Sequence, residues 1–286
     1  MNLTGTSLAP AGIVTLLGQL TDLHIREPGR LAYGRIDTAP YLARAVASVL
    51  RLPQRPDAFV LTGDLTDFGR AAEYEHLARL LAPLTMPFYL LPGNHDEREQ
   101  MRRSFPGHGY LGTSGPVKYS VRIGALRLLA LDTAVAGASH GELGDDQLDW
   151  LEAELAACGG EPVVIAMHHP PFSTLIGHMD RIGLLAGRER LEQIVRRHPN
   201  VERIICGHLH RAIEVRFGGT IASTSPAPGH QVCLDLAPDA ASAWTLEPPG
   251  YRLHAWTSEG RLVTHLAASG EFEGPYPFHE NGTLID

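Results

Sequence analysis

Cysteine is scarce in this chain, and its number excludes one class of small, covalently stabilised folds. The 286 residues include only Cys158, Cys206 and Cys233. An odd number of cysteines fits no complete disulfide framework, and no two of the three stand at the spacing of a metal site. We therefore expect reduced thiols packed inside the protein.

Basic charge and long apolar runs are also in short supply. Lysine and arginine total 24 against 32 acidic residues, which gives a formal net charge of −8. This balance argues against a general nucleic-acid-binding protein, because such a protein needs a basic face to neutralise phosphates. No apolar run approaches the roughly 20 residues that span a bilayer. Residues 1–12 lack the basic region and cleavage segment of a signal peptide, so we expect a cytoplasmic protein.

The chain is rich in histidine, and much of it occurs in a repeated setting. Five short apolar runs each end in Asp, Asn or His, as a buried strand does where it delivers polar side chains to one edge of a sheet. Ligands bind outside the carboxyl ends of parallel strands. We interpret the five ends as one shared metal centre. The residues at these ends are Asp22 and His24; Asp64; Asn94, His95 and Asp96; His168 and His169; and His208 and His210.

Apolar periodicity between these motifs alternates between strand and helix. Buried strands are predicted at 13–21, 58–61 and 88–91, with helices at 40–52 and 71–81 between them, which implies parallel strands with crossover helices. Further along, we predict a hairpin at 118–131, helices at 97–105, 145–156 and 188–196, strands at 163–166 and 204–205, and an all-β pattern from residue 213. We expect an N-terminal tail at 1–12, a catalytic domain at 13–236 and a C-terminal β extension at 237–286, too short for a core of its own.

The motifs and their order resemble those of the calcineurin-like metallophosphoesterases. The signature runs as Asp-x-His, Gly-Asp-x-x-Asp, Gly-Asn-His-Asp, His-x-Pro and Gly-His-x-His, and it extends here from about Leu16 to Arg211. Five short motifs in the family's order are far more specific than any one of them. The resemblance implies an α/β (α+β) fold, with a central β-sandwich of mixed sheets flanked by helices and a C-terminal β-hairpin cap or extension.

The same resemblance implies two divalent metal ions, of Fe, Mn, Zn or Co, and a hydroxide between them that attacks the phosphate. His95 would hydrogen-bond the phosphate and help to protonate the leaving oxygen, and Asp96 would orient the His95 imidazole. The implied ligands are Asp22, His24 and His210 for one ion, Asn94, His168 and His208 for the other, and Asp64 as the bridge between them.

Other residues near the motifs have less settled roles. The family's ligand is the histidine two before the proline, so His168 is assigned to the metal and His169 to the wall of the site. Asn94, His95 and His169 are expected to contact the substrate. Asp67 is expected to make a structural hydrogen bond in its turn. His230 matches a histidine that lines the substrate pocket in related enzymes. The arginines of the loop 26–35 either contact substrate or form a solvated charge cluster.

Further stretches narrow the resemblance to one bacterial branch. Tyr33-Gly34-Arg35-Ile36-Asp37 and Ser223-Thr224-Ser225-Pro226 are similar to the class III cyclic nucleotide phosphodiesterases and, more closely, to the glycerophosphodiesterases. The resemblance implies hydrolysis of small phosphodiesters, either 3′,5′-cyclic nucleotides or glycerophosphodiesters, by a homodimer or higher homo-oligomer. A phosphomonoesterase on the same site and a non-catalytic nucleotide- or metal-binding homologue are the alternatives, and the natural substrate and the metals stay open.

Overall fold

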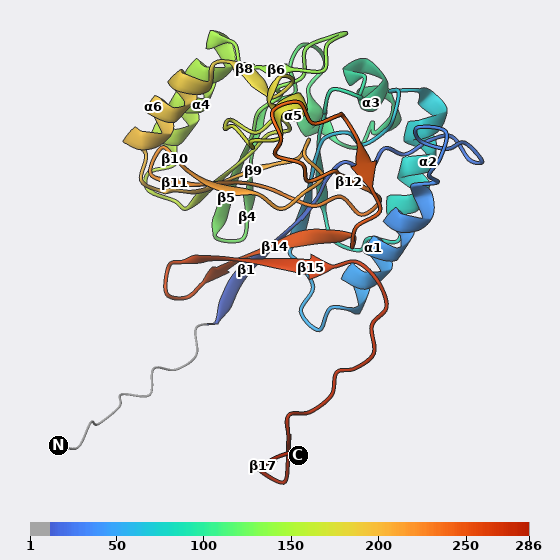
Figure 1. Ribbon diagram of the computed structural model, residues 1–286. Helices are drawn as coiled ribbons and strands as arrows, with labels where there is room; N and C mark the ends of the chain where they lie inside the picture. Colours follow the sequence, from blue (N-terminus) through green and yellow to red (C-terminus); the bar gives the residue numbers. More distant parts are fainter. Residues whose placement is uncertain (1–11, 286) are drawn as a thin grey trace, which may run out of the picture.

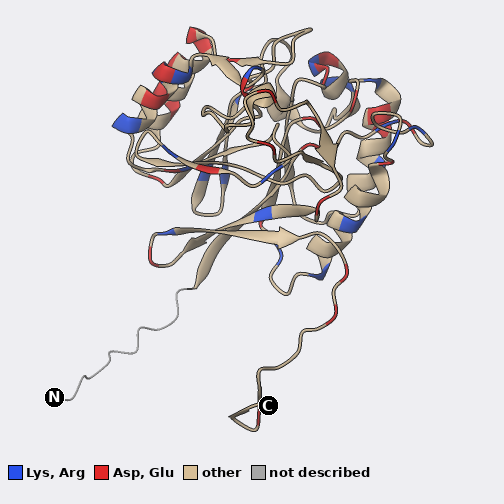
Figure 2. Ribbon diagram, viewed as in Figure 1, with Lys and Arg blue, Asp and Glu red and all other residues tan. Residues whose placement is uncertain are grey.

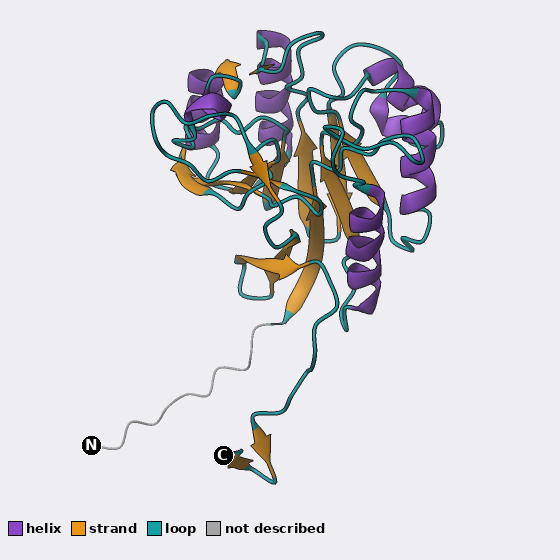
Figure 3. Ribbon diagram, turned by 45° about the vertical axis from the view of Figure 1, so that its right-hand side comes forward, coloured by secondary structure: helices purple, strands orange, loops and turns teal. Residues whose placement is uncertain are grey.

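The computed structural model describes residues 12–285, in which two β-sheets pack face to face between helices (Figure 1, Figure 3). The first sheet has the strand order β15-β14-β1-β2-β3, and the second has the order β10-β11-β9-β7-β5-β4. Both sheets are mixed. In the first, β1, β2 and β3 pair in parallel, and β14 and β15 add antiparallel pairs beside β1. In the second, the central strands pair in parallel and the two edge strands, β10 and β4, pair antiparallel. The predicted mixed α/β architecture is confirmed.

Three parallel strands of the first sheet carry the first motifs. They are β1 (Ile13–Leu20), β2 (Ala58–Thr62) and β3 (Phe88–Leu91). The crossover helices are α1 (Ala39–Arg51) and α2 (Ala71–Leu81), and α3 (Arg98–Ser104) follows the third strand. In α1, Pro40 occupies the first turn, where its missing N–H costs nothing, and Leu42, Val46 and Val49 form the buried stripe.

The second sheet contains the remaining motif strands. It consists of β4 (Tyr119–Ile123), β5 (Leu126–Ala130), β7 (Val163–Ala166), β9 (Val201–Cys206), β10 (Glu214–Phe217) and β11 (Thr220–Thr224). Helices α4 (Asp145–Ala157) and α6 (Arg188–Arg197) cover its outer face, on the side opposite α1 to α3 (Figure 1). The two motif strands of this sheet, β7 and β9, are hydrogen-bonded to each other in parallel, so their carboxyl ends lie at the same edge of the sheet.

The C-terminal segment completes the first sheet. Strand β14 (Gly250–Thr257) pairs antiparallel with β1, and β15 (Leu262–Ala268) pairs with β14. A long hairpin therefore lies at the edge of the sheet that carries the first motif, and buried Tyr251 belongs to the same core cluster as Leu17 and Leu20. The predicted domain boundary near residue 237 stays a prediction, and the predicted tail lies outside the described residues except for Gly12.

Several short elements were not predicted from the sequence. They are the 3₁₀ turn η1 (Gly109–Leu111), α5 (Gly177–Asp180) and the strands β6 (Gly141–Glu142), β8 (Leu184–Ala186), β13 (Trp244–Thr245), β16 (His279–Glu280) and β17 (Thr283–Leu284), whereas β12 (Gln231–Val232) falls within the predicted β pattern. The longest of them has four residues, which is too short to show a period. Among residues 12–285, no helix is long and apolar enough to cross a membrane.

Charged residues of both signs are mixed along the chain. Figure 2 shows Lys and Arg interleaved with Asp and Glu on the ribbon, most densely on α4 and α6. This pattern agrees with the argument from composition, because a nucleic-acid-binding face gathers cations on one side.

Candidate metal centre

Most of the predicted metal ligands have a backbone conformation that is uncommon for residues other than glycine. Five of them have a positive φ, between 45° and 71°, namely Asp22, His24, Asp64, His208 and His210. Such a conformation costs a non-glycine residue about 1–3 kcal/mol and persists only where the surroundings enforce it. Asp and His tolerate it better than most residues. The turns therefore point these side chains to a common centre at a cost in backbone energy, which is typical of a functional site.

Close approach between the motif loops requires glycine at two positions. A Cβ atom on Gly207 would overlap the Thr21 hydroxyl, and one on Gly93 would overlap the Asp64 carboxylate. A side chain at either place would push the loops apart. These two glycines explain why the third and fifth motifs both contain a Gly directly before the polar residues.

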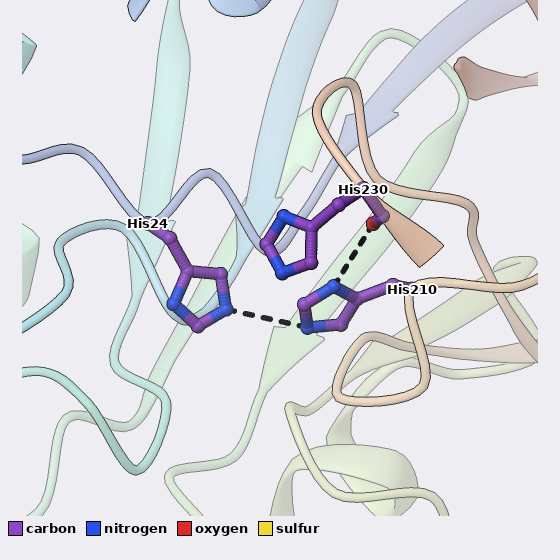
Figure 4. Close-up of side chains that lie close together, drawn as sticks. All are labelled: His24, His210 and His230. Atoms are coloured by element: carbon purple, nitrogen blue, oxygen red, sulfur yellow. Dashed lines mark hydrogen bonds between the residues drawn. The ribbon is translucent and has the colours of Figure 1, made fainter. Parts of the chain in front are cut away.

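One cluster of ligand atoms forms around the first and last motifs. Figure 4 shows the His24 and His210 rings pointing toward one another, with their Nε2 atoms 3.2 Å apart. Nε2 of His210 lies 3.5 Å from Oδ1 of Asp22, and Nε2 of His24 lies 3.6 Å from Oδ2 of Asp64. One ligand atom from each of these four residues lies within 4.8 Å of all the others.

A second cluster adjoins the first through Asp64. Nε2 of His168 lies 3.4 Å from Oδ2 of Asp64 and 3.2 Å from Oδ1 of Asn94. His208 belongs to the same cluster as His168, with their rings 5.2 Å apart. The carboxylate oxygen of Asp64 that faces His24 is therefore the one that also faces His168.

Two of the predicted ligands have a buried atom without a hydrogen-bond partner among the described residues, namely Oδ2 of Asp22 and Nε2 of His208, and so does the neighbouring His230, at Nδ1. A buried polar atom without a partner is costly, and in native proteins it needs an explanation such as an ion. Carboxylate, amide and imidazole groups are the ligands that Mn, Fe, Co and Zn accept. The donor set and its unpaired atoms fit divalent metal ions.

Hydrogen bonds behind the ring orient three of the histidines. Nδ1 of His168 donates to the main-chain oxygen of Thr62 (2.8 Å), and Nδ1 of His210 donates to that of His230 (3.1 Å). Nδ1 of His24 donates to the Asp67 carboxylate (3.2 Å). Because these oxygens can only accept, Nδ1 carries the proton in the neutral form of each ring, and in that form the lone pair of Nε2 is free for a ligand. All three rings therefore present a basic nitrogen to the centre.

Burial and neighbouring charge set the protonation of the metal-free cluster. Burial alone would raise the pKa of Asp64, but His168 and His95 lower it well below its usual value. Burial opposes a charge on His168 as well, yet the nearby Asp64 raises its pKa to about 9. Burial and the positive charge of His168 both lower the pKa of His208, to about 3. The cluster therefore offers an anionic carboxylate beside neutral and cationic imidazoles.

The structure corrects the predicted partner of His95. Oxygens of Asp96 accept hydrogen bonds from the main chain of Gly93, Leu65 and Thr66 and from the Tyr74 hydroxyl, so its carboxylate ties the second and third motif loops together. The His95 imidazole instead donates from Nδ1 to the main-chain oxygen of Asp67, at 2.9 Å.

Asp67 has a larger role than the structural turn bond predicted for it. Besides His24, its carboxylate accepts from Arg26 at 3.1 Å, and its other neighbours include His95 at 3.8 Å. Burial would raise the pKa of Asp67, but the bond with His24 lowers it, so the group is a carboxylate. The spacing Gly-Asp-x-x-Asp was the available signal for this residue. Arg26 forms ion pairs with Asp67 and Glu73, whereas the side chains of Arg30 and Arg35 are exposed to solvent.

His169 does not reach the cavity of the site. Its Nε2 donates to the main-chain oxygen of Ser139 (3.1 Å) and its Nδ1 accepts from the Thr133 hydroxyl (2.8 Å), and the side chain is fully buried. It packs against the rings of His168 and His208. The prediction that His169 binds substrate is therefore replaced by a packing role behind the ligands.

A cavity of about 380 Å³ opens over the two clusters. His230 lines it as predicted, and two aromatic residues that the sequence did not single out as site residues join it. The ring centroids of Tyr33 and Trp244 lie 5.1 Å and 5.4 Å from that of His230. The lining includes His24, Asp64, Asn94, His95, His208 and His210. The cavity therefore has a polar floor and an aromatic wall.

Two known bacterial phosphodiesterases are similar to this chain in sequence over most of their length. The chain is 38% identical over 269 residues to the probable glycerophosphodiester phosphodiesterase GpdQ of Arcobacter nitrofigilis, covering 94% of this chain and 98% of that protein. It is 34% identical over 255 residues to the 3′,5′-cyclic adenosine monophosphate phosphodiesterase CpdA of Pseudomonas aeruginosa, covering 88% and 89% of the two chains.

A solved structure with little sequence similarity has the same architecture. It is a dimetal phosphatase from Danio rerio, which superposes with a TM-score of 0.61 at 19% identity, over 91% of this chain and all of that one. Residues 16–212, which contain all five motifs, match the family described as Calcineurin-like phosphoesterase. The chain belongs to the calcineurin-like phosphoesterases.

Proposed function

We propose that this protein is a two-metal phosphodiesterase that hydrolyses small phosphodiesters. One observation carries the proposal: a single carboxylate oxygen, Oδ2 of Asp64, lies within 3.6 Å of imidazole nitrogens from two separate ligand clusters. A carboxylate placed in this way suits a pair of ions that share one ligand. Metal pairs of this kind act on phosphate esters.

The residues divide naturally between two ions. One ion would be held by Asp22, His24 and His210. The other ion would be held by Asn94, His168 and His208, and Asp64 would bind both ions. When bound, the two ions would supply an activated water as nucleophile and neutralise the phosphoryl oxygens. Fe, Mn, Zn and Co all suit these ligands, and the availability of each metal decides among them as much as affinity does.

His95 is placed to act on the leaving group. Its main-chain N–H donates to Oδ1 of Asp64, which fixes the backbone, and its Nδ1 donates to the Asp67 main chain, which fixes the ring. Nε2 remains for the substrate, and the side chain is partly open to the cavity, at 32% exposure. As an imidazolium, with a second proton on Nε2, His95 would hydrogen-bond a phosphoryl oxygen and donate that proton to the departing alcohol.

The cavity favours a diester over a monoester. In the part of the chain that the structure describes, no lysine or arginine lines it. A monoester carries one more negative charge than a diester at neutral pH, and Arg or Lys normally helps to bind such a dianion. The aromatic wall of Tyr33, His230 and Trp244 suits an organic group on the far side of the phosphate. Both named relatives act on diesters, a glycerophosphodiester and a cyclic nucleotide.

The test is a comparison of three substrates with Mn(II) added: glycerophosphoethanolamine, cyclic AMP and p-nitrophenyl phosphate. We expect faster turnover of a diester, and the faster of the two diesters identifies the substrate class. A preference for the monoester would make the protein a phosphatase on the same site. Failure to hydrolyse any of the three with both metals bound would favour the non-catalytic alternative. The homo-oligomer and the cytoplasmic location expected from the sequence stay predictions.

A further inference from the structure

Arg203, in β9, is a buried cation without a partner among residues 12–285. The residue is 7% exposed, and its Nε and Nη1 atoms are buried with no hydrogen-bond partner. Burial lowers the pKa of its guanidinium, an effect that Glu214 partly offsets. An uncompensated buried charge is strongly unfavourable, and proteins normally pair it with a counter-charge. Arg203 therefore indicates a ligand.

A cavity of about 670 Å³ lies against this side chain. Its lining comes from β9, from the β10–β11 hairpin and from the first residue of β15, and includes Arg203, Arg216, Ile221 and Leu262. In Figure 1 the β10–β11 hairpin and the loop between β14 and β15 lie on the same side of the molecule. The cavity is thus a separate site at the junction of the two sheets.

Strand register puts a second arginine on the same face. Arg203 is opposite Ile221 on β11, and Ile221 is opposite Arg216 on β10. Residues paired in this way share a face of the sheet, and two strand spacings separate the two arginine Cα atoms by about 10 Å. Arginine side chains are long enough for both guanidinium groups to contact one small ligand between them. Arg216 is exposed and also makes no ion pair within the described chain.

Nearby carboxylates do not neutralise the pair. Glu214 is engaged with Arg252, with Nη1 and Oε1 2.7 Å apart. Glu202 lines the cavity, but within residues 12–285 its carboxylate is not within ion-pair distance of either arginine. Among the undescribed residues, 1–11 contain no Asp or Glu, and residue 286 is an Asp at the end of the chain. The cavity therefore has two guanidinium groups that make no ion pair within the described chain, and only Glu214, beyond ion-pair distance, partly offsets the charge of Arg203.

We propose that this cavity binds a small tetrahedral dianion of the phosphate and sulfate class, held between Arg203 and Arg216. Two guanidinium groups match such an ion in charge and donate N–H groups in pairs to its oxygens. Arg203 precedes His208 by five residues, or about 16 Å along an extended strand, so the site is distinct from the metal centre. Its existence does not depend on the proposed hydrolysis.

The test is calorimetric titration of the full-length, metal-loaded protein with sodium sulfate, at ionic strength balanced with sodium chloride. Arg216→Ala removes the exposed arginine and should weaken a saturable 1:1 binding event about tenfold or more. Arg203→Met should do the same, and Arg216→Ala keeps the test decisive should Arg203→Met fail to fold. Arg44→Ala, an exposed arginine on α1, is the matched control and should bind as the wild type does.

A second measurement locates the ion. A crystal grown in selenate should show the selenium anomalous peak between Arg203 and Arg216, and diester hydrolysis should be unchanged in Arg216→Ala. Equal affinity for phosphate and glycerol 3-phosphate would assign the cavity to a phosphoryl group on a small molecule, and preference for phosphate would assign it to the free ion. Sulfate affinity unaltered by Arg216→Ala, or a selenium peak at the metal centre alone, would overturn the proposal.

Discussion

Nε2 of His24 and Nε2 of His210 face each other at 3.2 Å, and both rings hold their proton on the other nitrogen. Two lone pairs at this distance repel one another unless a proton or a cation lies between them. Burial opposes a charge on His24, but its bond with Asp67 raises the pKa of that imidazole, so His24 is the better proton holder in the metal-free chain. A metal ion would replace the proton and satisfy both nitrogens.

Replacement of Asp64 should remove metal and activity together. Because one of its oxygens faces both His24 and His168, Asp64→Ala deletes the group that both clusters share. Loss of a mere supporting residue costs about 10–100-fold in metal affinity or activity, so we expect a loss at the upper end of that range or beyond. Metal content by mass spectrometry and diester turnover measure the effect. Asp239→Ala, exposed and far along the chain, is the control, and wild-type turnover in Asp64→Ala would refute the assignment.

Asp67 and Asp96 should respond differently to the same chemical change. Asp67 orients His24 and its main chain holds His95, so Asp67→Asn should lower metal affinity or kcat about 10–100-fold. Asp96 ties backbone N–H groups of two loops together, so Asp96→Asn should mainly lower the free energy of unfolding, by about 1–3 kcal/mol. Urea unfolding and metal titration of both variants separate the two effects. The reverse pattern would restore Asp96 as the residue that orients His95.

Loss of His95 should slow the reaction without releasing metal. The residue lines the cavity, and it belongs neither to the group of Asp22, His24, Asp64 and His210 nor to that of His168 and His208. A positioned proton donor contributes about a hundredfold to ten-thousandfold, so His95→Gln should reduce kcat by that amount on glycerophosphoethanolamine. The loss should be smaller on bis(p-nitrophenyl) phosphate, because p-nitrophenolate departs without a proton. An equal loss on both substrates would show that His95 acts on the phosphate alone.

The sequence predicted the parts of the site that depend on local signals. Asp22, Asn94 and His208 each follow an apolar run and a turn, and a parallel sheet gathers such ends at one edge. Strand and helix periods were equally clear for β2 and α2, whose observed bounds differ from the predicted ones by one residue at most. These features need no knowledge of distant contacts.

The features that the sequence missed depend on tertiary contacts. Asp96 was paired with His95 because the two are adjacent in sequence, yet its oxygens face N–H groups some 30 residues earlier in the chain. Trp244 reaches the aromatic wall from a strand of two residues, which has no recognisable period. The pairing of β14 with β1 joins residues more than 230 positions apart. Local patterns carry no information on such partners.

A carboxylate beside the cavity should make stability depend on pH. Oxygens of Asp180 accept from the Thr174 N–H and hydroxyl, both at 2.7 Å, and from the Leu175 N–H, which fixes the loop that carries His178 and Met179 into the cavity lining. Burial would raise the pKa of Asp180, but a hydrogen bond from the Ser173 hydroxyl, together with these bonds from Thr174 and Leu175, lowers it below its usual value. A lowered pKa in the folded state stabilises the protein at pH values above the pKa of the unfolded chain, and this stabilisation disappears as the pH falls through the pKa of the folded state.

Asp180→Asn should therefore lower the free energy of unfolding by about 1–3 kcal/mol at pH 7 and by less at pH 3, as measured by urea unfolding against Asp239→Asn. A deficit that does not shrink at pH 3 would mean that the charge of Asp180 plays no part.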